Sequence, residues 1–182
     1  QVRGPVDSKR MKPFPAWHPL LIAASAAMAI GCARHPAEPA AEKPTRSLPD
    51  APAFELADLG GKVWTNADLS KGTYLVEYWA TWCVPCEELQ PTLERLAQRY
   101  KGNGLRILAV TEEAKTDVQA HVANFPTTYP ILVDAGGRVT KAWGVGRLPT
   151  TFLVRTGKVL GKWEGAIDGE SIESAVQGLY GG

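Results

Sequence analysis

From residue 53 onward, hydrophobic and polar positions switch repeatedly between the two-residue period of strands and the 3.6-residue period of helices. Residues 74–80 (YLVEYWA) are nearly all apolar or aromatic, which is typical of a strand buried on both faces. Shorter runs predict further strands, either single (105–110 and 131–133) or paired in hairpins (54–56 with 62–65, and 151–154 with 158–163).

Apolar residues at helical spacing predict three helices, at about 83–101, at 114–125 and around 172–179. Trp64, Trp143 and Trp163 are predicted to lie in the core, whereas His121 falls on the polar side of the second helix and is expected to be solvated. A βαβ core followed by a ββα end predicts an α/β fold in which helices flank a mixed sheet.

The part of the chain before residue 53 has a different pattern. Residues 20–30 form an uncharged apolar run of a length that fits the central region of a signal peptide, whereas a membrane span needs about 20 residues. The run ends in Ala-Ile-Gly before Cys32, which resembles the lipobox of bacterial lipoproteins, in which the cysteine is lipidated and becomes the mature N-terminus. An ordinary cleaved signal and an uncleaved anchor are the alternatives.

These patterns predict four parts of the chain. Residues 1–10 read as an upstream or misannotated segment, 11–31 as a lipoprotein-type signal peptide, and 32–52 as the lipid-anchor cysteine with a tether rich in Pro and Ala. Residues 53–182 form the folded domain, whose size is common for a single domain. We therefore expect an extracytoplasmic, periplasmic protein that is anchored to a membrane through Cys32.

Composition narrows the function classes. The 182 residues are 45% hydrophobic and 21% charged, which excludes a mostly disordered chain. Twenty basic residues against nineteen acidic ones give a net charge of +1, so nothing indicates a nucleic-acid binder. Three cysteines in a chain of this length do not make a disulfide scaffold.

The candidate chemistry lies in the motif Cys83-Val-Pro-Cys86, which follows the buried strand and opens the first helix. Two intervening residues place both sulfurs on one face of a helical turn, close enough to form a disulfide. At the helix N-terminus, free N–H groups and the helix dipole favour the thiolate of Cys83, which we expect to be the more exposed sulfur. Cys86 lies deeper and suits a resolving role. Pro85 fits the first turn because its missing N–H costs little there.

Two other interpretations of this motif are half of a structural zinc site and an inert disulfide. Zinc would need two more ligands, and only His121 lies within the folded domain as a candidate. The sequence therefore predicts a redox-active pair with no metal and no other cofactor. Peroxidase chemistry of the peroxiredoxin type is disfavoured because neither cysteine has a proline seven residues before it.

Residues 79–86 (WATWCVPC) and 148–153 (LPTTFL), with the lipoprotein-like start, resemble the thioredoxin-like superfamily and within it the TlpA/ResA-type membrane-anchored thiol–disulfide oxidoreductases. The resemblance covers about 53–180 and includes Pro91, which matches a helix-kinking proline. It implies a mixed central β-sheet flanked by α-helices. It also implies that Pro149 is cis and faces the disulfide, and that the Leu148 backbone pairs with substrate. Spacing alone leaves open a trans proline that starts a strand.

Glu77 stands inside the apolar strand, where a carboxylate costs free energy unless it is paired or protonated. The resemblance implies a buried acid that takes the proton of the resolving cysteine, and Glu77 matches that position. Family members often have Asn here and an acid three residues after the second cysteine, where this chain has Leu89. Glu88 is the substitute candidate, and a solvent-facing Glu77 on an edge strand is the alternative.

The function favoured by these residues is reduction of disulfides in partner proteins by a monomer that receives electrons from a membrane protein. Trp82 is expected to shield Cys83 and shape the docking surface, although simple packing is the alternative. Apocytochrome c, a copper-site assembly protein and general reduction all fit as targets. The competing class is a binding or redox-sensor module that uses the disulfide as a latch.

Overall fold

The computed structural model describes residues 48–165 and 169–181, so the predicted signal segment and Cys32 lie outside the described residues. Seven strands are described: β1 Glu55–Ala57, β2 Val63–Thr65, β3 Thr73–Tyr78, β4 Leu105–Thr111, β5 Ile131–Val133, β6 Thr150–Arg155 and β7 Lys158–Glu164. The helices are α1 Asn66–Leu69, α2 Val84–Arg99, the 3₁₀ turn Lys101–Asn103, α3 Lys115–Asn124, α4 Arg138–Ala142 and α5 Gly169–Tyr180.

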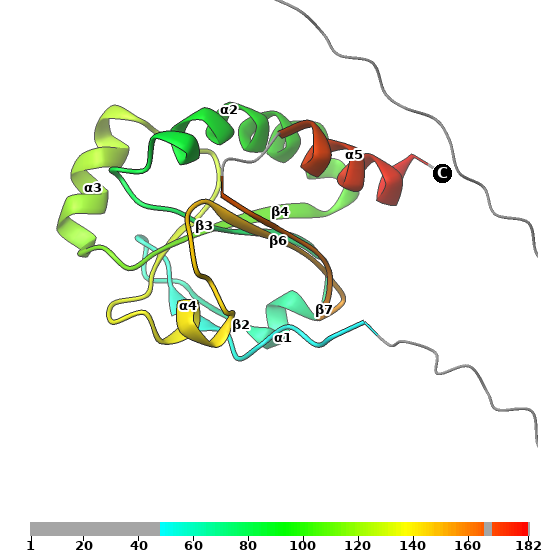
Figure 1. The fold of residues 1–182 in the computed structure, drawn as a ribbon, viewed down its shortest axis with the longest axis horizontal. Coiled ribbons are helices and arrows are strands. Elements are labelled where there is room, and N and C mark those ends of the chain that lie inside the picture. The colour runs from blue at the N-terminus through cyan, green and yellow to red at the C-terminus, as the bar shows by residue number, and fades with distance from the viewer. Residues whose placement is uncertain (1–47, 166–168, 182) are drawn as a thin grey trace, which may run out of the picture. The chain divides into compact units, whose positions relative to one another are not determined.

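Five strands form one mixed sheet in the order β5-β4-β3-β6-β7 (Figure 1). β3 pairs in parallel with β4, and β4 with β5, whereas β6 runs antiparallel to both β3 and β7. β1 and β2 form a separate antiparallel pair. The predicted fold class, with a mixed sheet flanked by helices, is confirmed.

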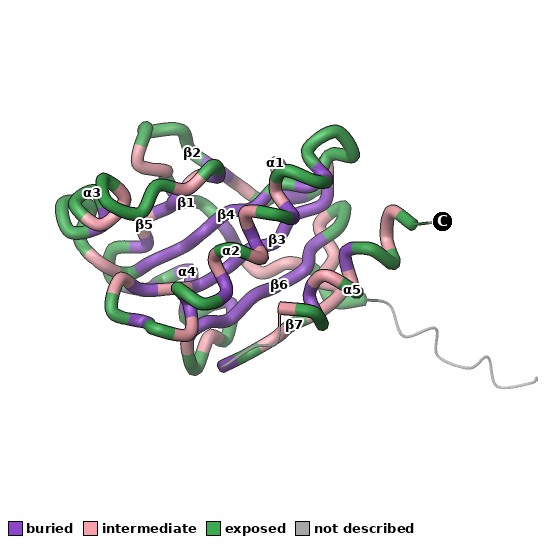
Figure 2. The backbone as a smooth tube through the Cα atoms, turned by 90° about the horizontal axis from the view of Figure 1, so that it is seen from above, coloured by how far each residue is buried: buried purple, intermediate pink, exposed green. Residues whose placement is uncertain are grey.

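Alternation along β3 divides the core into two layers. Tyr74, Val76 and Tyr78 pack on one face of the sheet with the β1–β2 hairpin, α1 and α4, while Leu75 packs on the other face with α2, α3 and α5. Figure 2 shows the buried stretches running along the central strands between these layers. The period of two places Glu77 on the same face as Leu75, underneath α2.

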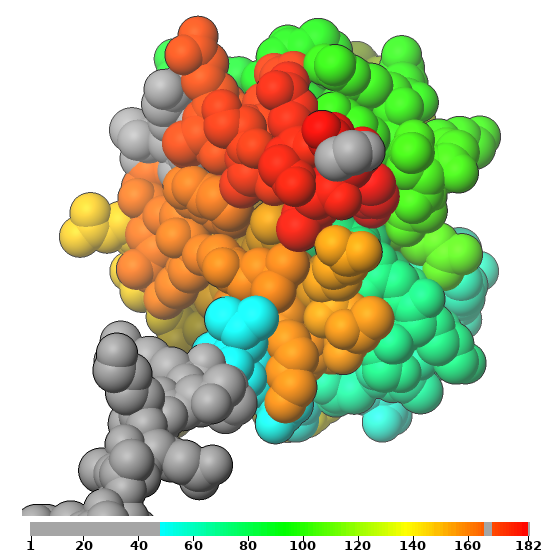
Figure 3. Space-filling model, turned by 90° about the vertical axis from the view of Figure 1, so that its right-hand side faces the viewer, coloured from blue at the N-terminus to red at the C-terminus, as the bar shows by residue number. Residues whose placement is uncertain are grey.

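The chain enters this domain at the end of the sheet that is opposite to the cysteines. Asp50 pairs with Lys158 through a β-bridge and an ion pair of 2.6 Å, and the Ala51 N–H donates to the Gly157 carbonyl. In Figure 3 this start of the described chain, in cyan, lies against the orange β6–β7 hairpin. The hairpin turn at Thr156-Gly157 has positive φ at both residues, which suits a two-residue hairpin loop.

Three short elements were not predicted from the sequence: α1, the 3₁₀ turn and α4. Each has only three to five residues, so none contains enough turns to show a helical period. Trp64 and Trp143 lie in the core as predicted, but Trp163 on β7 is only partly buried because β7 is an edge strand.

Candidate active site

The two cysteines form a disulfide at the start of α2. The sulfurs are 2.01 Å apart and the Cα atoms 5.3 Å apart. Cys83 is the N-cap of the helix, and its carbonyl accepts hydrogen bonds from the N–H groups of Cys86 (3.0 Å) and Glu87 (3.2 Å). Pro85 lies in the first turn and Pro91 is inside the helix, as the sequence predicts. The positive end of the helix dipole at this first turn can stabilise a thiolate on Cys83.

The expected difference in exposure between the sulfurs is not present in the disulfide form. Cys83 is 4% exposed and Cys86 is 3% exposed, so the two are equally buried. The bond itself holds both sulfurs against Ala80, with Trp79 and Leu148 packed around them. In this state the helix N-terminus, rather than accessibility, distinguishes the two cysteines.

The loop opposite the disulfide contains the cis peptide bond between Leu148 and Pro149, which confirms the predicted cis proline. The Thr150 hydroxyl donates to the Arg147 carbonyl (2.6 Å), and the Gly165 N–H donates to the Pro149 carbonyl (2.8 Å). Within the described chain, the backbone N–H and C=O of Leu148 make no hydrogen bond. These two groups are therefore available to pair with an extended segment of another protein.

A cleft of about 440 Å³ lies beside the disulfide and is lined by residues that include Trp82, Val145 and Leu148. Trp82 is 73% exposed and Val84 is 61% exposed, so both present apolar surface at the edge of the disulfide. A tryptophan this exposed is not a packing residue of the core. The arrangement supports the interpretation of Trp82 as part of a docking surface.

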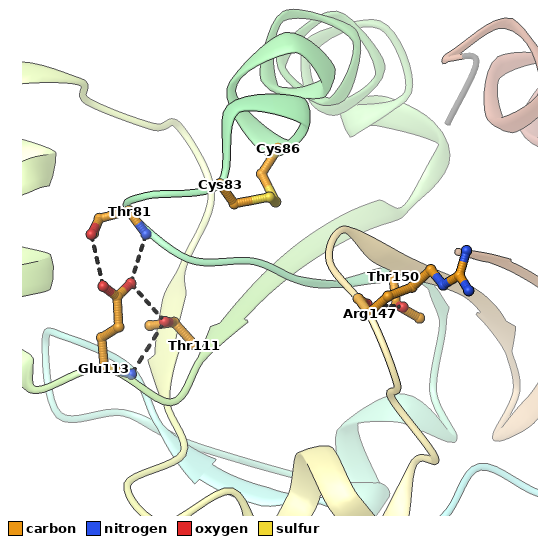
Figure 4. Close-up of a disulfide and its surroundings, with 7 residues drawn as sticks. All are labelled: Thr81, Cys83, Cys86, Thr111, Glu113, Arg147 and Thr150. Atoms are coloured by element: carbon orange, nitrogen blue, oxygen red, sulfur yellow. Dashed lines mark hydrogen bonds between the residues drawn. A yellow bond between two sulfur atoms is a disulfide. The ribbon is translucent and has the colours of Figure 1, made fainter. Parts of the chain in front are cut away.

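Glu113 holds the loop that leads into Cys83, and sequence reasoning missed it. Its carboxylate accepts the Thr81 N–H (2.6 Å) and the Thr81 hydroxyl (2.7 Å), and it also accepts the Thr111 hydroxyl (3.2 Å). Figure 4 shows this carboxylate on one side of the loop and the disulfide on the other, while the Arg147 side chain points away from the sulfurs.

The signal for Glu113 was present in the strand register. β3 and β4 are parallel with partners 32 positions apart, from Thr73 opposite Leu105 to Tyr78 opposite Val110. Continuing this register past both strands puts Thr81 opposite Glu113, the pair that is hydrogen-bonded. The carboxyl ends of neighbouring parallel strands meet at one edge of a sheet, so the two loops are forced together.

Glu77 is 3% exposed on the central strand β3, which contradicts the alternative of a solvent-facing side chain. Burial raises its pKa from the ordinary 4.5 to about 8. Within the described residues its carboxyl group has no hydrogen-bond partner. Glu88, the substitute candidate, is exposed on α2.

Glu77 and Cys86 line the same small cavity under the start of α2. The cavity has a volume of about 20 Å³, and its wall also includes Trp79, His121 and Tyr129. The expectation that His121 is merely solvated is wrong, because its ring is partly buried between Trp79 (centroids 5.4 Å apart) and Phe125 (4.9 Å). Helical spacing put His121 on the outer face of α3 but could not show that α3 packs at the mouth of this cavity.

Comparison with known proteins agrees with this geometry. The model of the AhpC/TSA family matches residues 49–162. The thiol-disulfide oxidoreductase ResA of Geobacillus thermodenitrificans is 39% identical over 132 residues, which are 71% of this chain and 75% of that protein. ResA of Bacillus subtilis is 37% identical over 114 residues, or 61% of this chain and 63% of that protein.

Solved structures show the same fold. A Chlorobium tepidum protein assigned to the thiol:disulfide interchange proteins of the DsbE type superposes with a TM-score of 0.68 at 29% identity, over 72% of this chain and 95% of that one. A thiol-disulfide oxidoreductase from Bacteroides fragilis gives a TM-score of 0.64 at 24% identity, over 72% and 99%. The second likeness concerns the fold alone.

A redox-competent cysteine pair at a helix N-terminus, facing a cis proline on a mixed sheet, defines a thioredoxin-like thiol–disulfide oxidoreductase. The chain belongs to the AhpC/TSA family, and the curated proteins that it matches include thiol-disulfide oxidoreductases named ResA.

Proposed function

We propose that this protein reduces disulfides in partner proteins outside the cytoplasm, with Cys83 as the attacking and Cys86 as the resolving cysteine. The observation that carries the proposal is the shared cavity of Cys86 and Glu77, because it places an unpartnered carboxyl group beside the sulfur that must lose a proton. An inert latch has no need of such a group, which destabilises the fold when it ionises.

The reaction proceeds in two exchanges. The Cys83 thiolate attacks a partner disulfide, which forms a mixed disulfide and releases one partner thiolate. Glu77 then accepts the proton of the Cys86 thiol, and the Cys86 sulfur attacks Cys83. The bond between Cys83 and the partner breaks, so the partner leaves with both sulfurs reduced and the chain keeps the Cys83–Cys86 disulfide.

The direction of electron flow is inferred from the residues around the pair. Val84 and Pro85 carry no charge, and Glu87 and Glu88 disfavour a thiolate rather than stabilise it. The reduced form therefore gains little extra stability, and we expect a reduction potential nearer about −270 mV than about −120 mV. In an oxidising compartment such a reductant needs an electron-donor protein, for which Trp82 and the Pro149 loop offer the docking surface.

The deciding experiment has two parts. Cys86→Ser should trap a mixed disulfide with a partner protein, which mass spectrometry then identifies, while Cys83→Ser should trap nothing. Equilibration of the purified protein with glutathione should give a midpoint more negative than roughly −160 mV. A more positive midpoint would make the protein an oxidant, and a pair that exchanges with no protein disulfide would support the latch.

Membrane tethering through Cys32 is part of the same proposal and rests on the sequence pattern at residues 20–32. In the part of the chain that the structure describes, no helix is both long and apolar enough to cross a bilayer. Cys32→Ser should release the protein from membranes and leave its activity in solution intact. Tight membrane association of that variant would show that residues 20–30 act as an anchor.

A further inference from the structure

The Glu77 cavity contains more polar groups than a packing defect would. The indole N–H of Trp79 is buried and has no partner among the described residues, and the Glu77 carboxyl group has none either. Burial, together with the charges of Glu77 and Glu94, raises the pKa of the Tyr129 hydroxyl, which therefore remains a donor at this wall. A volume of about 20 Å³ is enough for one water molecule, which needs two to four polar partners of this kind.

A buried base that accepts a proton must also return it to solvent before the next cycle. Glu77 lies on the central strand beneath α2, and its exposed fraction of 3% gives it almost no direct contact with bulk water. His121 lies on the wall of the same cavity, because α3 packs beside the N-terminal end of α2 (Figure 1). Its side chain is only partly buried, so it also reaches solvent. An imidazole is the side chain best suited to exchange protons near neutral pH.

We propose that His121 is the proton-transfer residue of this site and connects Glu77 to solvent through a water molecule held in the cavity. The inference rests on the proposed function and adds the route by which its base is reset. After Glu77 has taken the Cys86 proton, the water accepts that proton and passes another to the His121 imidazole, which releases it to solvent. In this step only O–H and N–H bonds break and form, so no sulfur bond changes and Glu77 returns to its carboxylate form.

The other titratable groups around the cavity serve this route less well. Glu87 on α2 contributes to the wall but is exposed. Tyr129, on the segment before β5, stays protonated, and Glu94 raises the pKa of Tyr129 without lining the cavity. His121 is the group on α3 that faces the cavity. Its position is fixed by ring contacts with Trp79 and Phe125, so the imidazole is held at the mouth rather than free in solvent.

Both exchange steps can be followed in one trace by mixing the reduced protein with 5,5′-dithiobis(2-nitrobenzoate). The first release of thionitrobenzoate reports attack by Cys83, and the second reports resolution by Cys86. Because the pKa of Glu77 is about 8, most of this carboxyl group is protonated at pH 7 and must first lose its proton by the same route before it can act as the base. His121→Ala should therefore slow the second phase about tenfold at pH 7 and leave the first phase within about twofold. Added imidazole should restore the second phase in proportion to its concentration, while the native protein should not respond to imidazole.

Two further variants keep the test decisive. His121→Gln retains a polar side chain without a titratable group and should show the same slow second phase if His121→Ala folds poorly. Ile131→Val changes the volume of the same cavity without removing a titratable group or a ring contact of His121, and should leave both phases within about twofold. A second phase that is unchanged in both His121 variants, or slowed but not restored by imidazole, would overturn the relay. Loss of the first phase in the native protein would instead contradict the proposed function.

Discussion

Two carboxyl groups flank the disulfide, one on each side, and they differ in whether they have hydrogen-bond partners. On the cleft side, the Glu113 carboxylate accepts hydrogen bonds from Thr81 and Thr111 and holds the active-site loop. On the α2 side, Glu77 faces a small cavity without a partner in the described residues. A satisfied carboxylate fixes geometry, whereas an unsatisfied one is available to exchange a proton. Glu113 therefore holds the loop on one side of the disulfide, and Glu77 is available for proton transfer on the other.

The largest expected effect is on the pH dependence of stability. Glu77 has a pKa of about 8 in the folded protein and an ordinary value near 4.5 when unfolded, so the folded state binds the extra proton between these values. Its contribution is complete below about pH 4.5 and is lost as pH rises through 8, by about 1.4 kcal/mol per pH unit and on the order of 4–5 kcal/mol in all.

Urea unfolding of the disulfide form at several pH values measures this slope. Glu77→Gln should remove most of the decline between pH 5 and 8, because the amide does not titrate. Glu88→Gln, on the exposed side of the same region, is the matched control and should retain the decline. An equal slope in the native protein and in Glu77→Gln would mean that Glu77 is already ionised in the fold.

The next effect is on the rate of resolution. Glu77→Gln should slow the second exchange step about 100-fold, as removal of a general base does, and leave attack by Cys83 nearly unchanged. In the native protein this step should accelerate with pH up to about 8, because the carboxylate form is the base and its pKa is about 8. Stopped-flow measurement of both phases checks this, and equal slowing of both would assign Glu77 a structural role.

A smaller effect is expected from the partnered carboxylate. Glu113→Ala removes the acceptor for the Thr81 N–H and hydroxyl, and should lower the free energy of unfolding by about 2 kcal/mol. Glu112→Ala, its exposed neighbour, should change it by less than about 0.5 kcal/mol. Chemical denaturation compares the two. Glu113→Ala should also leave the pH slope assigned to Glu77 intact, and a change in that slope would show that the two sides are coupled.

The smallest effect concerns docking. Trp82→Ala should weaken use of a protein disulfide by about fivefold in KM, since an exposed apolar side chain contributes roughly 1 kcal/mol to such a contact. The same variant should react normally with a small aromatic disulfide, which does not need the cleft. The comparison uses steady-state rates of reduction of insulin disulfides and of the small aromatic disulfide. Equal losses on both substrates would mean that Trp82 takes part in the exchange reaction itself.

Sequence reasoning predicted the elements that are long enough to show their hydrophobic pattern and the residues that belong to a recognisable motif. β3, α2, β4 and the β6–β7 hairpin lie where the apolar pattern put them, and the cis proline was predicted through its family resemblance. The resemblance also implied a buried acid at Glu77, and the central position of β3 in the sheet rules out the solvent-facing alternative that the pattern left open.

Contacts between distant segments were harder to predict. His121 reads as a surface residue because helical spacing describes one helix and not what the helix packs against. Glu113 has no motif of its own and gains meaning only when β3 and β4 are known to be parallel with a fixed register. The equal burial of the two cysteines depends on the disulfide state, which spacing does not specify.

The parallel register of β3 and β4 has a consequence for protein engineering. The geometry of the loop before Cys83 is supplied by an acid that lies 32 positions later in the chain, on a neighbouring strand end. Transplanting residues 79–86 into another scaffold would transfer both sulfurs but not the carboxylate that orients their loop. A portable version of this redox site must therefore carry two strands and two loops, and a library that varies Thr81 should vary Glu113 with it.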